Sequence, residues 1–138
     1  MAFKYETTVK LYDTDAAGIV FFGNYIRIAH DAYQSYLEEN GFSFAQTLRD
    51  RQVLIPIVHT EADYLQPAIV GDRLVIHMTC SKISAHSFVL RYLMKRADGA
   101  DLAAVSTVHV MIELAGNQKI ELPLPLRQVL ERIYLAAE

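Results

Sequence analysis

The sequence contains a single cysteine, Cys80, so no disulfide can form within the chain. It also lacks any apolar run of the roughly 20 residues that a membrane-spanning helix needs. The first six residues include Lys4 and Glu6 and have no apolar core of the kind found in signal peptides. A lone cysteine without an export signal is typical of the reducing cytoplasm, which is therefore the predicted location, away from the membrane.

The chain has no excess of basic charge. Lysine and arginine number 13 against 16 acidic residues, and the net charge is −3. This balance argues against nucleic acid or an anionic membrane surface as the main partner. Hydrophobic residues make up 52% of the chain and charged residues 21%, a balance that predicts a folded core and not disorder. A length of 138 residues fits one domain covering 1–138.

The hydrophobic period changes along the chain from two to 3.6 and back to two. Alternation predicts strands and helical spacing predicts helices. The expected elements are a strand at 3–12, a long helix at 24–40, a short helix at 43–51, strands at 53–65, 73–82, 87–95 and 102–114, and a closing helix at 126–137. Pro56 should interrupt the 53–65 strand, and Asp98-Gly99 should form a tight connection between two strands.

The long helix carries one apolar stripe, formed by Tyr25, Ile28, Ala29, Ala32, Tyr33, Tyr36 and Leu37. Asn24 is the expected N-cap, and Gly41 the expected terminator just past the last turn. Strands joined by hairpins favour an antiparallel sheet, and one long helix packed on it makes an α+β domain.

Each later strand has one apolar face. The expected core faces are Leu74, Ile76, Met78 and Cys80; Phe88, Leu90, Tyr92 and Met94; and Leu102, Ala104, Val108, Val110 and Ile112. The opposite face is partly apolar at Val75, Val89, Leu93, Val105 and Met111. Since a large apolar patch is rarely left in water, we expect another subunit to cover part of this face.

The loop before the long helix carries two carboxylates, Asp13 and Asp15. The N-terminus of a helix has unpaired N–H groups and a partial positive charge, so it can hold a developing oxyanion. A carboxylate beside such a site can attack an acyl carbon or activate water. Because residues two apart in an extended segment point opposite ways, only one carboxylate should face a pocket, while the other bonds local backbone amides.

Other interpretations of this loop remain open. Aspartates before a helix often form turns or caps. A calcium loop would need an oxygen ligand at its fifth position and a glutamate at its twelfth, where the chain has Ala17 and Asn24. An aspartyl-phosphate phosphatase also uses Asp-x-Asp, but it needs an alternating α/β chain and an acidic cluster for magnesium.

No residue set in the sequence has the spacing of metal ligands or of a serine hydrolase. The histidines, at positions 30, 59, 77, 86 and 109, show no paired spacing, so neither a metal nor a cofactor is expected. Cys80 shares an apolar strand face and is interpreted as a core residue, not a nucleophile. No serine occupies a strand-turn-helix elbow.

The segment from Asp13 to Tyr25, Asp-Thr-Asp-Ala-Ala-Gly-Ile-Val-Phe-Phe-Gly-Asn-Tyr, resembles the signature of the 4-hydroxybenzoyl-CoA thioesterase family. The resemblance covers nearly the whole chain and implies a hot-dog fold, in which an antiparallel sheet wraps around one long helix. Segments 54–59, 71–74, 84–88 and 107–110 are closer to the cyanobacterial members that act on 1,4-dihydroxy-2-naphthoyl-CoA.

The resemblance also implies which residues act. Asp15 matches the catalytic aspartate, and the backbone N–H of Phe22 matches the oxyanion donor. His30 stands where a relative has an aspartate that recognises the hydroxyl of the substrate ring. Ser84 and His86 lie where a relative has a basic cluster near the CoA nucleotide. The substrate-binding set implied by the resemblance is Gly18, Val20, Tyr25, His30, Ile57, His59, Ser84 and His86.

The expected function is hydrolysis of an aromatic acyl-CoA, most specifically 1,4-dihydroxy-2-naphthoyl-CoA in phylloquinone or menaquinone synthesis. The alternatives are a thioesterase for other acyl-CoA or acyl carrier protein substrates, and a non-catalytic hot-dog module that binds acyl-CoA. Family resemblance further implies a homodimer or homotetramer with sites at the subunit interface.

Overall fold

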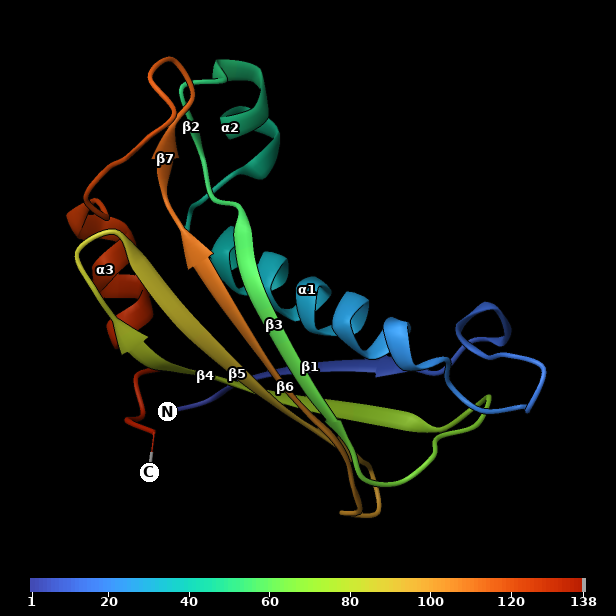
Figure 1. The fold of residues 1–138 in the computed structure, drawn as a ribbon. Coiled ribbons are helices and arrows are strands. Elements are labelled where there is room, and N and C mark those ends of the chain that lie inside the picture. The colour runs from blue at the N-terminus through green and yellow to red at the C-terminus, as the bar shows by residue number, and fades with distance from the viewer. Residues whose placement is uncertain (138) are drawn as a thin grey trace.

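The computed structural model describes residues 1–137. In chain order it contains β1 (Phe3–Thr8), a 3-10 turn η1 (Leu11–Asp13), α1 (Phe22–Glu39), α2 (Phe44–Asp50), β2 (Val53–Leu54), β3 (Ile57–Tyr64), β4 (Arg73–Ile83), β5 (Ser87–Arg96), β6 (Asp101–Val110), β7 (Ile112–Glu113), β8 (Gln118–Lys119) and α3 (Leu124–Glu131) (Figure 1).

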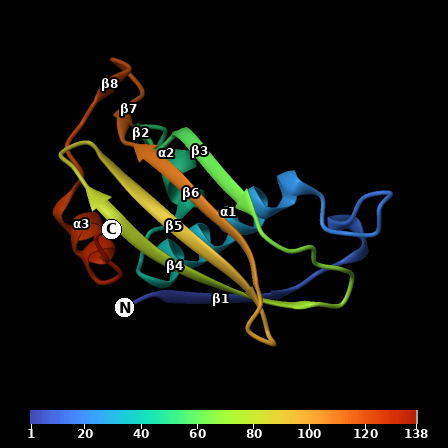
Figure 2. The ribbon, with the colours of Figure 1, turned by 60° about the horizontal axis from the view of Figure 1, so that its bottom comes forward.

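One sheet dominates the molecule and curves around α1. Its five strands lie in the order β1-β4-β5-β6-β3, and every neighbouring pair is antiparallel. Figure 2 shows the helix lying across the inner side of this sheet, with α3 at one end. A small sheet, β2-β7-β8, extends from the same end. The predicted α+β architecture, an antiparallel sheet around one long helix, is confirmed.

The long helix forms because its apolar stripe has a sheet to pack against. All seven residues predicted for the stripe are buried. The predicted N-cap is wrong, because Phe21 and not Asn24 precedes the first turn. Asn24 is the third helical residue, and its side chain leaves the helix to reach the backbone of Asp13. Gly41 does end the helix, with φ +92 and its N–H donating to Glu38 O at 3.2 Å.

The inner faces of β4 and β5 are as predicted, but the predicted inner face of β6 is out of phase. Strand pairing sets Tyr92 opposite Val105 and Phe88 opposite His109, so Val105, Thr107 and His109 point inward. The register shifts beside Met94, where Leu102 is an extra residue in β6. Since a one-residue shift exchanges the two faces of a strand, a pattern counted from Leu102 assigns the wrong side.

The outer face of the sheet is only partly as predicted. Val75, Val89 and Leu93 are half-buried there, but Val105 is 3% exposed and faces the core. Met111 is also buried, at 5% exposure. Because β6 is out of phase, Ala104, Val108 and Val110 lie half-buried on the outer face instead, so the apolar part of that face consists of different residues from those predicted.

The first strand and the closing helix end earlier than predicted, and the predicted break in the 53–65 strand is present. The first strand ends at Thr8, because the chain turns through η1. The break at Pro56 is confirmed, and it transfers the chain from β2 in the small sheet to β3 in the large one. The closing helix ends at Glu131, because the following residues run beside β4, where Cys80 N–H donates to Ile133 O at 2.8 Å.

Candidate active site

The loop between η1 and α1 is closed by its own backbone. Asp15 N–H donates to Ile19 O at 3.0 Å, and Gly18 N–H donates to Asp15 O at 3.0 Å. Gly18 has φ +80, a conformation that side chains disfavour, so this glycine is needed for the turn itself. The second half of the loop is attached to the rest of the protein where Val20 N–H donates to Ala68 O at 2.9 Å.

The Asp15 carboxylate lies exposed at the tip of this loop. Its Oδ1 accepts the Ala17 N–H at 2.9 Å. The other oxygen, Oδ2, has no hydrogen-bond partner among residues 1–137. One oxygen therefore fixes the carboxylate while the second is free to react.

The N–H of Phe22 is the first of helix α1, and no acceptor for it lies within residues 1–137. The first N–H groups of any helix lack intrahelical partners and carry the positive end of its dipole. The carbonyl of the same residue accepts the hydroxyl of Tyr64 at 3.1 Å, which joins the end of β3 to the start of α1.

Asp15 and Phe22 line one cavity of about 470 Å³. Its walls are formed by Asp15, Ile19, Val20, Phe22, Tyr25, Tyr64, Leu65, Gln66 and Pro67. The rings of Tyr25 and Tyr64 lie 5.5 Å apart between centroids, and those of Phe22 and Tyr64 lie 6.2 Å apart. The cavity therefore places Asp15 and Phe22, the first residue of α1, beside an aromatic wall. Of the predicted set, it brings together Asp15, Phe22, Val20 and Tyr25.

The wall residues 64–67 were not predicted from the sequence. Tyr64 was seen only as the end of a strand, and no motif marks the three residues after it. Their position depends on the pairing of β3 with β6, where Tyr64 lies opposite Ala103. An aromatic residue at the end of the expected 53–65 strand was the one available signal.

Asp13 has the opposite environment to Asp15. Its side chain is 4% exposed and forms an ion pair with Arg27 of α1. Its Oδ2 accepts the Lys10 N–H at 2.8 Å, the kind of local backbone bond that the sequence predicted. The ion pair was not predicted, because Arg27 lies 14 residues along the chain. The two carboxylates thus have separate roles, one structural and one facing the cavity.

His30 lines a different cavity, of about 320 Å³. It lies there with Tyr33, Phe44, Leu54 and Pro56, among others. Eight residues of helix separate His30 from Phe22, which is about 12 Å along α1. Within one chain, His30 is therefore not part of the Asp15 cavity.

The remaining predicted residues also lie away from Asp15 within the chain. Ile57 is half-buried at the start of β3, and His59 contacts Glu61 at 2.8 Å on the exposed side. Ser84 and His86 form the β4–β5 turn, where Ser84 O accepts Arg127 Nη2 at 2.8 Å. A single chain does not bring these four residues to the Asp15 cavity.

His109 and Cys80 are buried titratable residues of the core. His109 is fully buried and stacks on Phe88, with ring centroids 4.7 Å apart. Its Nε2 shares a hydrogen bond of 2.7 Å with Thr107, and burial lowers the pKa of His109 to about 3. Burial also raises the pKa of the Cys80 thiol to about 11, so the thiol is protonated at neutral pH. The interpretation of Cys80 as a core residue is confirmed.

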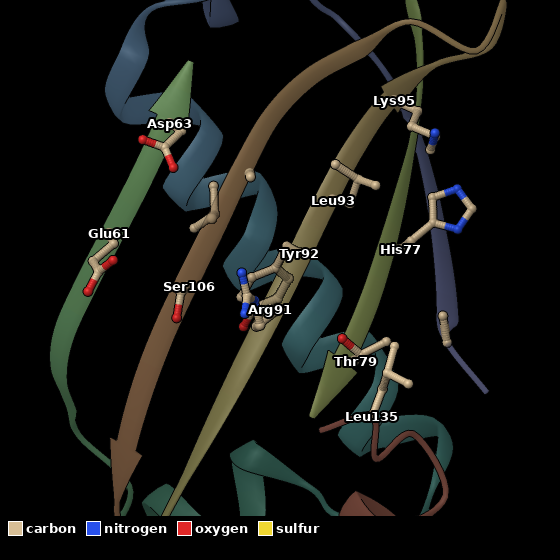
Figure 3. Close-up of a pocket in the computed structure, with 13 residues that line it drawn as sticks. Glu61, Asp63, His77, Thr79, Arg91, Tyr92, Leu93, Lys95, Ser106 and Leu135 are labelled. Atoms are coloured by element: carbon tan, nitrogen blue, oxygen red, sulfur yellow. The ribbon is translucent and has the colours of Figure 1, made fainter. Parts of the chain in front are cut away.

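A second hollow of about 470 Å³ lies on the outer face of the sheet (Figure 3). Carboxylates of Glu61 and Asp63 come from β3, and cationic side chains of Arg91 and Lys95 come from β5. The residues that line this hollow include no helix N-terminus, so it lacks the helix start that lies beside Asp15. Residues 1–137 contain no group of three or more His, Cys, Asp or Glu side chains placed to hold a metal ion. No described helix is both long and apolar enough to cross a membrane.

Comparisons with a family model and with individual known proteins indicate the same family. The family model of the thioesterase-like superfamily matches residues 9–132. The 1,4-dihydroxy-2-naphthoyl-CoA hydrolase of Synechocystis sp. is 38% identical over 124 residues, covering 89% of this chain and 90% of that protein.

Solved structures agree. A 1,4-dihydroxy-2-naphthoyl-CoA thioesterase from Synechocystis superposes with a TM-score of 0.90 at 35% identity, covering 94% of this chain and 96% of the other. A gentisyl-coenzyme A thioesterase superposes with a TM-score of 0.81 at 26% identity, covering 93% and 98%. These similarities confirm the predicted hot-dog fold.

Proposed function

The chain belongs to the thioesterase-like superfamily, and from this premise we propose that it hydrolyses 1,4-dihydroxy-2-naphthoyl-CoA to 1,4-dihydroxy-2-naphthoate and CoA. The observation that carries the proposal is the cavity that Asp15 shares with Phe22, the first residue of α1, in a chain 38% identical to a hydrolase named for this substrate. The cavity wall of Phe22, Tyr25 and Tyr64 offers aromatic faces to a flat acyl ring.

In the proposed reaction, the thioester oxygen binds at the start of α1. The Phe22 N–H and the helix dipole polarise the carbonyl and stabilise the oxyanion that forms when the acyl carbon is attacked. Removal of one oxyanion donor costs about 3 kcal/mol of transition-state stabilisation in enzymes of this kind of chemistry. The helix N-terminus is thus a large part of the proposed rate enhancement.

Asp15 supplies the other half of the reaction, by one of two routes. As a nucleophile, its free oxygen attacks the acyl carbon, the CoA thiolate leaves, and water then hydrolyses the mixed anhydride. As a general base, it takes a proton from water, which attacks the same carbon directly. In both routes the net change is addition of water across the C–S bond, and no metal or cofactor is needed.

We further propose that the enzyme is a homodimer or homotetramer. β3 pairs with β6 on one side only, so its other edge is unpaired among residues 1–137. An exposed strand edge is a template for pairing with a second copy. Antiparallel pairing of two β3 strands would set the start of one beside the end of the other, so Ile57 and His59 would approach the Tyr64 wall of the partner. This arrangement would complete the site with residues that one chain leaves apart.

The product defines the proposed biological setting, which is phylloquinone or menaquinone synthesis in the cytoplasm. A second candidate is a thioesterase for another hydroxylated aromatic acyl-CoA, which the similarity to a gentisyl-coenzyme A thioesterase favours.

A substrate panel tests the proposal. Free thiol release is measured with 1,4-dihydroxy-2-naphthoyl-CoA, 4-hydroxybenzoyl-CoA, gentisyl-CoA, palmitoyl-CoA and an acyl carrier protein thioester. We expect the naphthoyl substrate to have the highest kcat/KM, at least about 100-fold above palmitoyl-CoA. Preference for a fatty acyl group would overturn the aromatic assignment. Tight CoA binding without turnover on any substrate would indicate a binding module.

A further inference from the structure

Asp13 contacts the first two turns of α1 through both its backbone and its side chain. Its carbonyl oxygen accepts two hydrogen bonds, from Phe21 N–H at 2.9 Å and from Asn24 Nδ2 at 2.8 Å. Its carboxylate pairs with Arg27 and accepts the Lys10 N–H at 2.8 Å. Through these hydrogen bonds and this ion pair, Asp13 attaches both ends of the loop that carries Asp15 to helix α1.

These contacts fix the two groups on which the proposed chemistry depends. Asp15 follows Asp13 by two residues, and Phe22 directly follows Phe21. Since Asp13 O accepts a hydrogen bond from Phe21 N–H, the Asp15 carboxylate and the Phe22 N–H are held at a fixed separation. Asn24 and Arg27, one turn apart on α1, keep Asp13 in that place.

We propose that Asn24 and Arg27 are positioning residues, which act through Asp13 to hold the Asp15 carboxylate at the correct distance from the Phe22 N–H. The inference rests on the proposed function, since it gives these residues a part in the same reaction. We name the set of Asp13, Asn24 and Arg27 the Asp13 clasp.

The surroundings of the clasp distinguish positioning from general stability. The second half of the loop has its own anchor, the hydrogen bond from Val20 N–H to Ala68 O, and Ile19 bridges to Ile69. The loop therefore remains attached when the clasp is cut. What changes is the placement of Asp15 relative to α1, and a misplacement of about 1 Å can cost about 100-fold in rate.

The Arg27 contacts are also suited to this role. The Asp13 carboxylate is 4% exposed and the Arg27 side chain 45% exposed, so the pair is shielded on the Asp13 side. Arg27 also donates from Nη1 to Asp31 Oδ2 at 3.0 Å, one turn further along α1. The second bond limits the rotation of the guanidinium group. Loss of Arg27 leaves a buried carboxylate without its counter-ion, which favours displacement of the residue.

The kinetic test compares Asn24→Ala and Arg27→Met with wild type and with Arg73→Met. Arg73 is a matched control, because it forms an exposed ion pair with Glu6 at 3.0 Å outside the site. We expect kcat to fall about 10-fold to 100-fold in both clasp variants, with KM within about 3-fold. Arg27→Lys, which keeps the positive charge, should recover most of kcat. Values of kcat within about 3-fold of wild type in both clasp variants would overturn the proposal.

A double-variant cycle adds a readout that general destabilisation does not mimic. Asp13→Asn and Arg27→Gln should each lower kcat, and the double variant should lose little more than the worse single one. Losses that multiply in the double variant would mean that the two residues act independently, which contradicts a shared clasp.

Amide hydrogen exchange tests the clasp without any substrate. Exchange of the Phe21 and Lys10 N–H groups should be at least about 10-fold faster in Arg27→Met than in wild type, and unchanged in Arg73→Met. If wild type hydrolyses no acyl-CoA, the proposed function fails, while exchange still decides whether the clasp holds the loop. Unchanged exchange in Arg27→Met would overturn the clasp even in an active enzyme.

Discussion

Asp13 and Asp15 are separated by one residue, and their different surroundings give them different chemical roles. Asp13 is buried against Arg27, whereas Asp15 is exposed with one free oxygen. The sequence predicted this division, because neighbouring carboxylates in an extended segment point opposite ways. It did not predict Arg27, since an ion pair across a turn and a helix depends on where the helix begins. The N-cap was expected at Asn24, three residues later than the observed N-cap, Phe21.

His30 provides the first test at this scale. It lines a mostly apolar cavity with Tyr33, and their ring centroids lie 5.5 Å apart. If this cavity holds part of the acyl ring in the assembled enzyme, His30→Ala should raise KM for the naphthoyl substrate about 10-fold while kcat falls less than about 3-fold. The comparison is made by steady-state kinetics with two aromatic substrates. A collapse of kcat on both would place His30 in the chemistry.

The buried side chain of His109 makes the unfolding free energy depend on pH. Burial lowers its pKa to about 3, below its ordinary value of 6.5, so the unfolded chain binds a proton that the folded chain excludes. The stabilising contribution is therefore complete above pH 6.5 and is lost as the pH falls toward 3. Within that window His109 should make the unfolding free energy fall by about 1.4 kcal/mol per pH unit.

The matched variant is His109→Phe, which keeps a ring against Phe88 and removes the titration. Thr107 retains a partner there, since its hydroxyl also bonds Tyr92 at 2.9 Å. Urea unfolding between pH 6.5 and 4 should show a shallower loss of stability in the variant. Equal slopes in the two proteins would contradict the assignment.

At the scale of helices and strands, the sequence predicts the long periodic segments well. It predicts the pairing register of the strands poorly. The stripe of α1 and the inner faces of β4 and β5 follow their patterns, because each packs on one continuous core. β6 does not, since the extra residue Leu102 shifts the phase of the strand. Inward Thr107 and His109 break the apolar alternation, so the pattern favoured the wrong face. A bulge depends on the partner strand, which a single sequence does not reveal.

The β5–β6 hairpin was predicted from Asp98-Gly99 and can be tested there. Gly99 has φ +98, and an added Cβ would meet no atom within 4 Å, so strain is the only cost of a side chain. Gly99→Ala should lower the unfolding free energy by about 1 kcal/mol, and Gly99→Asn by less, because Asn tolerates positive φ. Urea denaturation measures both. A fully stable Gly99→Ala would contradict the strained turn.

For the whole molecule, the fold was accessible from the sequence because element order and one long helix restrict the architectures available. The complete site was not accessible, because it depends on tertiary pairing and, in our proposal, on a second subunit. The predicted residues Ile57, His59, Ser84 and His86 lie apart from Asp15 in one chain, as expected if the partner supplies part of the site.

The oligomer is tested by its mass. Light scattering at micromolar concentration should give at least twice the chain mass of 15.6 kDa. Val58, which is 58% exposed on the edge strand β3, is the residue to change. Val58→Lys should weaken association and activity together, since a charge on an edge strand opposes pairing. Leu124→Lys, at a site 64% exposed on α3, is the control that should keep wild-type mass. A monomeric, fully active wild type would contradict the subunit proposal.

The most direct test of the central claim is the rate of CoA thiol release from 1,4-dihydroxy-2-naphthoyl-CoA by wild type and by Asp15→Asn. Asn keeps the shape of the side chain but has neither the negative charge nor the basicity, so kcat should fall about 10²-fold to 10⁴-fold while KM changes little. Asp101→Asn, which alters an exposed carboxylate paired with Lys95 at 2.9 Å, should keep wild-type kcat. Near-normal kcat in Asp15→Asn, with wild type active, would contradict Asp15 as the catalytic carboxylate.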